Sequence, residues 1–147
     1  MTLSEKIDSD IKQAMLSKDE ARLSTVRFLK SALKYAAIEK SGALADAEVL
    51  QIIQKQIKQR RESIAQFSAN GRQEMADKEE NEARILEAYL PKQLSGDDLR
   101  RVVEQEVKAQ GAASKKDFGR MMKHLTEKLA GSADNKSLSE ALGKLLS

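Results

Sequence analysis

The sequence predicts an all-α protein, on three observations. Its 147 residues include three Phe, two Tyr and no Trp, fewer aromatic residues than the core of a β-sheet usually contains. Ala, Leu, Lys, Glu and Gln, which are strong helix formers, are frequent throughout. Apolar residues recur at the spacing of amphipathic helices, between side chains that cap helix starts and glycines that end helices. We therefore expect about seven helices.

Four helices are predicted before residue 94. Thr2 and Glu5 form a capping box at the start of the first, and Pro91 ends the fourth because proline lacks the amide hydrogen that a helix needs. The predicted spans are 2–18, 19–42, 46–71 and 77–90. The second helix presents one apolar face, made of Leu23, Val26, Leu29, Leu33 and Ala37.

Three shorter helices are predicted after Pro91. Ser95 and Asp98 have the spacing of a reciprocal cap, and so do Ser114 and Asp117. The predicted helices span 95–111, 114–131 and a final segment over 138–145. We therefore divide the chain into an N-terminal helical domain of residues 1–94 and a small three-helix domain of residues 95–147.

Composition excludes several classes of protein. The 26 Lys and Arg against 23 Asp and Glu leave a net charge of +3, too small by itself to mark a DNA-coating protein. The absence of cysteine excludes disulfide scaffolds, thiol catalysis and cysteine-ligated zinc. No apolar run reaches the roughly 18 residues of a membrane span, and the first residues lack the layout of a secretory signal. We therefore expect a cytoplasmic protein with no membrane contact.

Little in the sequence points to catalysis, a metal or a cofactor. His124 is the only histidine, so motifs that need two are impossible, and we interpret it as a surface or boundary residue. Acidic pairs such as Glu79 and Glu82 lie in a hydrophilic segment where nothing would raise their pKa. Nucleotide-binding loops of the Walker or G-x-G-x-x-G type are absent. We expect no catalytic residues, no metal and no cofactor.

Basic residues gather in two regions where several cations together would hold phosphates. Those after Ser114 lie within two helical turns of a helix start, whose amides also favour anions, and Asp117 is the only acid among them. The alternative is an ordinary solvated helix face whose cations pair with nearby glutamates. The candidate nucleic-acid-binding residues are Lys115, Lys116, Arg120, Lys123 and Lys136, with Arg27, Lys30, Lys34 and Arg61 as an extension.

Two stretches in the C-terminal part resemble a known family. Residues 112–122, Ala-Ala-Ser-Lys-Lys-Asp-Phe-Gly-Arg-Met-Met, and residues 131–136, Gly-Ser-Ala-Asp-Asn-Lys, resemble a signature shared by two groups of proteins. These groups are the YqeY-like proteins and the tail of the B subunit of glutamyl/aspartyl-tRNA amidotransferase, GatB. Other landmarks of YqeY-like proteins are similar to residues 58–63, 71–72, 82 and 85–94, so the resemblance spans essentially the whole chain.

The resemblance implies an N-terminal helical domain joined to a small three-helix domain. In amidotransferases the tail contacts the outer corner of tRNA, while glutamine hydrolysis and amide transfer take place on other domains and subunits. It therefore implies a tRNA-docking role, and only a nominal association with carbon–nitrogen ligases that use glutamine as amido donor. Three positions depart from the family pattern: Ala130 and Ser132 stand where basic residues are expected, and Asn135 replaces a glycine.

Two functions follow from these observations. The first is a non-catalytic accessory protein that binds tRNA through the basic residues named above. The second is a helical interaction module that partners an aminoacyl-tRNA synthetase or an amidotransferase subunit, with Phe118, Met121 and Met122 as its contact edge. Gly119 costs about 1 kcal/mol relative to alanine inside a helix, so we expect another helix or a ribose-phosphate chain to approach it closely.

Overall fold

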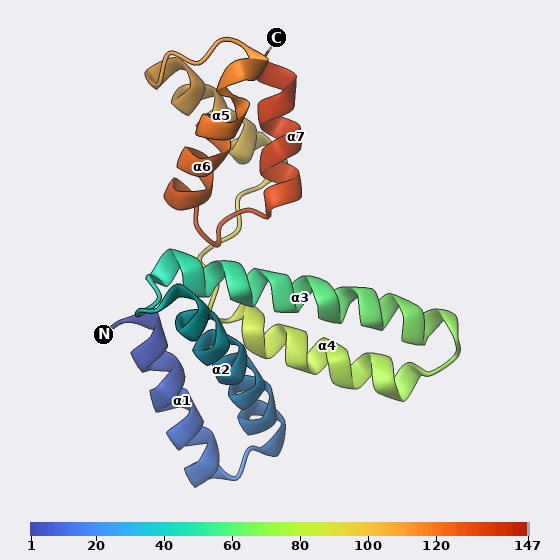
Figure 1. Ribbon diagram of the computed structural model, residues 1–147. Helices are drawn as coiled ribbons and strands as arrows, with labels where there is room; N and C mark the ends of the chain where they lie inside the picture. The colour runs from blue at the N-terminus through green and yellow to red at the C-terminus, as the bar shows by residue number, and fades with distance from the viewer. Residues whose placement is uncertain (147) are drawn as a thin grey trace. The chain divides into compact units, whose positions relative to one another are not determined.

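The computed structural model describes residues 1–146, and every regular element in that range is helical (Figure 1). The prediction of an all-α protein is therefore confirmed. The elements are α1 (Leu3–Ser17), α2 (Glu20–Lys40), α3 (Asp46–Ala69), α4 (Gln73–Glu87), α5 (Gly96–Ala109), the 3-10 turn η1 (Lys115–Asp117), α6 (Phe118–Lys128) and α7 (Asn135–Leu145). The chain forms two compact units, a first unit of Met1–Leu90 and a second unit that begins at Pro91.

Side-chain caps start α1, α2 and α5 as the sequence predicts, whereas α3 and α4 begin without one, and α4 begins at Gln73 and not at the predicted residue 77. Some helix ends also differ. Thr2 Oγ1 accepts the N–H of Glu5 at 3.1 Å, and the Glu5 carboxylate accepts the N–H of Thr2 at 3.2 Å. At the end of α2 the left-handed residue is Ser41, with φ 61°, and not the predicted Gly42. Lys18 closes α1 in the same way, with φ 56°. Glycine is thus not required at either position.

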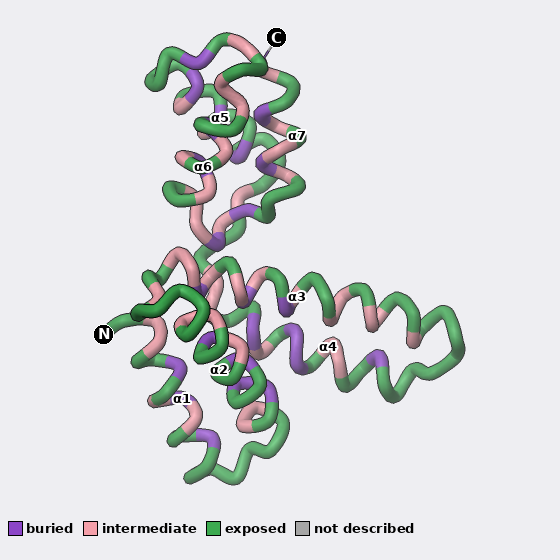
Figure 2. Tube along the Cα trace, viewed as in Figure 1, coloured by how far each residue is buried: buried purple, intermediate pink, exposed green. Residues whose placement is uncertain are grey.

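The first unit is built from two helical hairpins around one apolar core. α1 packs against α2 and α3 packs against α4, and the buried segments of α3 and α4 face each other (Figure 2). The buried core consists of Ile7, Val26, Leu29, Leu33, Val49, Ile53 and Leu86. Each such side chain gains roughly 1.5–3 kcal/mol on leaving water, so this core is what holds the two hairpins together.

A buried polar contact ties α1 to the end of α4. The Tyr89 hydroxyl donates to the carboxylate of Asp10 at 2.5 Å, and Asp10 is only 7% exposed. Arg22 and Lys6 also approach this carboxylate, at 3.6 and 3.4 Å. Burial, followed by the hydrogen bond to Asp10, raises the pKa of Tyr89. The nearly buried carboxylate of Asp10 thus has hydrogen-bond and ion-pair partners, without which burying its charge would be strongly unfavourable.

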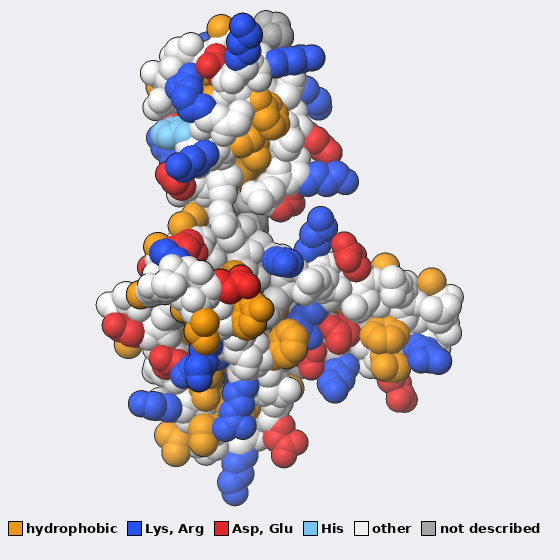
Figure 3. Space-filling model, in the orientation of Figure 1, with side chains coloured by type: hydrophobic (Ala, Val, Ile, Leu, Met, Phe, Trp, Pro, Cys, Tyr) orange, Lys and Arg blue, Asp and Glu red, His pale blue; other side chains and the backbone are white. Residues whose placement is uncertain are grey.

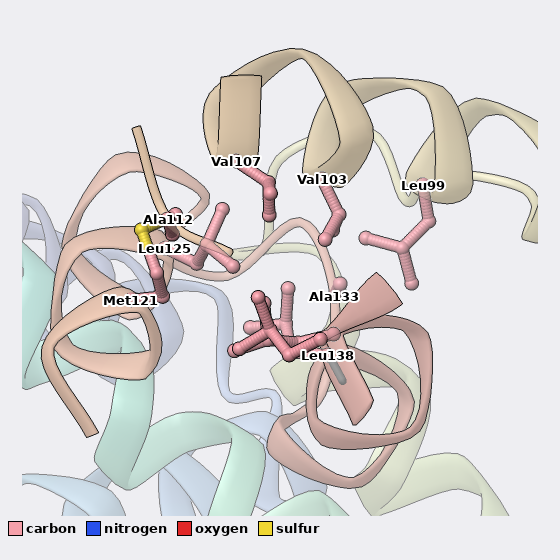
Figure 4. Packing of buried hydrophobic residues seen from close by; sticks show 10 residues of the cluster. Leu99, Val103, Val107, Ala112, Met121, Leu125, Ala133 and Leu138 are labelled. Carbon is pink, nitrogen blue, oxygen red and sulfur yellow. The ribbon is translucent and has the colours of Figure 1, made fainter. Parts of the chain in front are cut away.

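The second unit has its own core between α5, α6 and α7. Leu99, Val103 and Val107 point from α5 toward Leu125 of α6 and Leu138 of α7 (Figure 4). The segment before α5 is attached to the turn between α6 and α7. There the N–H of Leu94 donates to the carbonyl of Ser132 at 2.9 Å, and the Gln93 amide donates to the carbonyl of Gly131 at 2.5 Å.

The Asp10 contact leads to a stability prediction. Replacing Tyr89 with Phe removes one donor from a nearly buried carboxylate, so the free energy of unfolding should fall by about 1–2 kcal/mol in urea denaturation. Tyr35→Phe is the matched control, because Tyr35 is 66% exposed and its hydroxyl has no partner within residues 1–146. Equal effects of the two substitutions would contradict the role of the Asp10 contact.

Candidate nucleic-acid interface

The basic segment of the second unit begins at a local cap. The carboxylate of Asp117 accepts the backbone N–H groups of Ala113 and Ser114, at 3.1 and 3.4 Å. It also accepts from Arg120, at 3.3 Å. The Ala113 amide first, then Arg120 and the Ser114 amide, lower the pKa of Asp117. The only acid within this basic segment is therefore occupied by the backbone and by one arginine.

Three lysines around this cap have no acidic partner. Lys115, Lys116 and Lys123 are exposed, and none of them forms an ion pair with any residue between 1 and 146. The spacing of Lys116, Arg120 and Lys123 is i, i+4 and i+7, which places them along one side of the segment that runs from η1 into α6. Met121 and Leu125 are fully buried on the other side of α6. The cations therefore point away from the core.

A separate acidic group lies where α5 and α6 meet. Glu106 of α5 accepts from Lys128, and its other oxygen lies 2.7 Å from Nε2 of His124. Lys128, followed by His124, lowers the pKa of Glu106. The expectation that His124 is a surface or boundary residue fits its partial exposure, but its acidic partner was not predicted. That partner comes from another helix, and no local pattern in the sequence indicates it.

Lys136 does not join the cations that follow Ser114. α6 and α7 run in opposite directions, so the start of α7 lies beside the end of α6 (Figure 1). α6 has 11 residues, and at 1.5 Å per residue about 16 Å separate its two ends. Lys136 lies in the first turn of α7, which is capped by Asp134 through the N–H of Ser137 at 2.7 Å. It is exposed, but at the far end of α6 from Lys115 and Lys116.

The four candidate cations of the first unit lie in different surroundings. Lys30 forms an ion pair with Asp8 at 2.6 Å. Arg61 of α3 forms ion pairs with two acids of α4, Glu87 at 2.6 Å and Glu80, and these contacts raise the pKa of its guanidinium. Lys34 is exposed without an acidic partner in the described chain. Arg27 is also exposed, and its guanidinium donates to the sulfur of Met15 at 3.6 Å.

Two other expectations for the C-terminal part are not met. Met121 is fully buried, and Phe118 and Met122 pack against the core of the second unit. These three side chains therefore do not form the exposed contact edge that the sequence predicts. A Cβ at Gly119 would meet no atom within 4 Å, so the expected close approach of another helix does not occur.

Comparison with known proteins decides the family. The family model described as Yqey-like protein matches residues 4–146. The chain belongs to the YqeY-like protein family. The resemblance to this family that residues 112–122 and 131–136 suggested is thus confirmed, and the match covers nearly the whole chain.

Two curated relatives come from yeasts. A protein of Kluyveromyces lactis named "Altered inheritance of mitochondria protein 41, mitochondrial" is 40% identical over 84 residues, which are 56% of this chain and 45% of the relative. The protein of the same name from Saccharomyces cerevisiae strain YJM789 is 33% identical over 133 residues, 90% of this chain and 70% of the relative. The match thus spans about half the length of the first relative and more of the second.

These relatives correct one expectation. The sequence predicts a cytoplasmic protein, but the similar proteins are named as mitochondrial, so that prediction is wrong. It relied on the absence of an apolar span and of the layout of a secretory signal, and neither feature distinguishes the cytoplasm from the interior of mitochondria. Within residues 1–146 no helix has the length and apolarity needed to cross a membrane.

The Glu106 contacts give a pH prediction for this YqeY-like protein. Because its pKa is lowered in the folded state, Glu106 stabilises the fold above about pH 4.3, the ordinary pKa of a glutamate, and this contribution is lost as the pH falls through the lowered pKa. Glu106→Gln should therefore reduce Tm at pH 7, and the deficit should shrink toward zero in strongly acidic buffer.

Glu127→Gln is the control for this experiment. Glu127 is exposed on α6 and forms no ion pair with the described residues, so its substitution should leave Tm nearly unchanged at both pH values. A Tm deficit of Glu106→Gln that stays constant down to pH 2 would show that ionisation of Glu106 does not stabilise the fold.

Proposed function

We propose that this YqeY-like protein is a non-catalytic tRNA-binding accessory protein. The observation that supports the proposal is the basic segment of the second unit, where Lys115, Lys116 and Lys123 are exposed and lack carboxylate partners in the described chain. The neighbouring acid, Asp117, is occupied by backbone amides and Arg120. The resemblance of residues 112–122 and 131–136 to the tail of the amidotransferase B subunit favours tRNA over other polyanions as the ligand.

The chemistry of this surface suits phosphate contacts. Lysines without acidic partners displace the counterions condensed on a nucleic-acid backbone when they bind its phosphates, so binding is favoured at low salt. A segment that neutralises about three or four phosphates gives a slope near −3 for the logarithm of affinity against the logarithm of salt concentration. Phosphate contacts do not read base sequence, so different tRNAs are expected to bind with similar affinity.

The proposal does not need every basic residue predicted from the sequence. Lys30 and Arg61 are neutralised by Asp8 and by Glu80 and Glu87, so neither adds an available charge. Lys136 is available at the other end of α6, where it would meet a different phosphate from the one at Lys116. We propose no ligase reaction for this chain, although the resemblance carries a nominal association with carbon–nitrogen ligases.

The decisive variants reverse charge within the basic segment. Lys116→Glu and Lys123→Glu should each weaken the binding of fluorescently labelled tRNA at least about fivefold at 50 mM KCl and reduce the salt slope by about 1 or more. Fluorescence anisotropy at several KCl concentrations measures both quantities.

Lys55→Glu is the matched control, because Lys55 is an exposed lysine of α3 without an ion pair in the described chain. We expect little change in tRNA affinity for this variant. No tRNA binding by the unsubstituted chain at low salt, or equal losses in all three variants, would reject the proposal.

A further inference from the structure

A second apolar face lies on α2, opposite the core of the first unit. Its members follow one another at alternating steps of four and three residues: Ser24, Phe28, Ser31, Tyr35 and Ile38. We call this set the α2 stripe. Phe28, Tyr35 and Ile38 are 61%, 66% and 66% exposed. Figure 3 shows hydrophobic side chains among Lys and Arg over α1 and α2 on the face in view.

The spacing of the α2 stripe is that of a helix-packing face. Steps of four and three residues are the a and d positions of a heptad, which form the contact line between two packed helices. From Ser24 to Ile38 the stripe is about 21 Å long at 1.5 Å per residue, long enough for a partner helix of about four turns. The core face of the same helix, with Val26, Leu29 and Leu33, is already covered by the first unit. The stripe is therefore an additional face.

A hollow in the N-terminal half of the α2 stripe has room for a side chain of a partner helix. Ser24 and Ser31 are the small members of the set, and they line a shallow hollow of about 420 Å³ together with Phe28, Arg27, Leu23 and Glu20. Alternation of large side chains with such hollows is what allows side chains of two helices to interlock.

The charge beside the middle of the α2 stripe is of one sign, whereas the acids Glu20 and Glu39 lie beside its two ends. Residues 21–38 contain four Lys and Arg and no Asp or Glu. Two of these cations are engaged inside the first unit, Arg22 with Asp10 and Lys30 with Asp8. Arg27 and Lys34, one residue before Phe28 and Tyr35, have no carboxylate partner within the described chain. They lie at the flanking positions where partner helices place complementary charges.

We infer that the α2 stripe is a docking site for an amphipathic helix of another protein, with acidic residues flanking its apolar face. The apolar side chains of that helix cover Phe28, Tyr35 and Ile38, and its carboxylates pair with Arg27 and Lys34. This inference goes beyond the proposed tRNA binding, which uses the second unit.

Two other occupants suit the stripe less well. Single-stranded RNA binds by stacking bases on aromatic rings, but Ile38 is aliphatic and the guanidinium of Arg60 already lies 5.8 Å from the centre of the Phe28 ring. A second copy of the chain would bring the same two cations to the middle of the stripe, and its carboxylates there, Glu20 and Glu39, lie only at the two ends.

The test uses the full chain and a designed fluorescent peptide of three heptads, with Leu at positions a and d and Glu at positions e and g. We expect saturable binding with a dissociation constant in the micromolar range. Tyr35→Ala should weaken it at least about tenfold, because it removes a large apolar contact from the centre of the stripe. Lys34→Ala should weaken it about threefold and reduce its dependence on salt.

Matched controls separate the stripe from the rest of the surface. Met75→Ala removes an exposed apolar side chain of α4, and Lys55→Ala removes an exposed lysine of α3. Both should leave the affinity for the peptide unchanged. A peptide with Lys in place of every Glu should bind at least about tenfold more weakly than the acidic peptide.

Several results would overturn the inference. One is absence of peptide binding up to about 1 mM; another is an affinity that Tyr35→Ala does not change. A dimer in sedimentation that Tyr35→Ala dissociates would assign the stripe to a second copy. A tenfold loss of tRNA affinity in the same variant would assign it to RNA. Loss of tRNA binding in Lys116→Glu with intact peptide binding would leave the inference standing.

Discussion

The basic surface of the second unit depends on how the carboxylates of that unit are paired. The Asp117 carboxylate accepts hydrogen bonds from the amides of Ala113 and Ser114 and from Arg120. Glu106 is held by Lys128 and His124 at the boundary between α5 and α6. With these acids occupied, Lys115, Lys116 and Lys123 remain exposed and unneutralised in the described chain. A basic surface therefore arises in a unit that has 11 Lys and Arg against 8 Asp and Glu, which accounts for the whole net charge of +3.

Local sequence signals predicted the helices well because caps depend on residues only three positions apart. The Thr2 and Glu5 pair closes as expected. The signal is weaker at helix ends, where Ser41 takes the left-handed conformation next to a glycine that the pattern favoured. Gly42 and Ser41 are adjacent, so the predicted and observed ends of α2 agree within the one or two residues by which helix boundaries vary.

The site was harder to predict because ion pairing depends on contacts between helices. Nothing in the sequence indicates that Lys30 meets Asp8 of α1, or that Arg61 meets Glu80 and Glu87 of α4. The same limit applies to α2, whose apolar residues were interpreted as a single face. Phe28, Tyr35 and Ile38 form a second face, which became evident only once the buried side of the helix was known.

The two surfaces differ in chemistry and would serve different ligands. The segment from η1 into α6 offers lysines without exposed large apolar neighbours, which suits a phosphate backbone, whereas α2 offers apolar side chains with two flanking cations. The most direct test of the central claim is an NMR titration of the isotopically labelled full chain with tRNA. We expect amide shifts concentrated in residues 113–124. Shifts confined to the first unit, or no shifts at low salt, would contradict it.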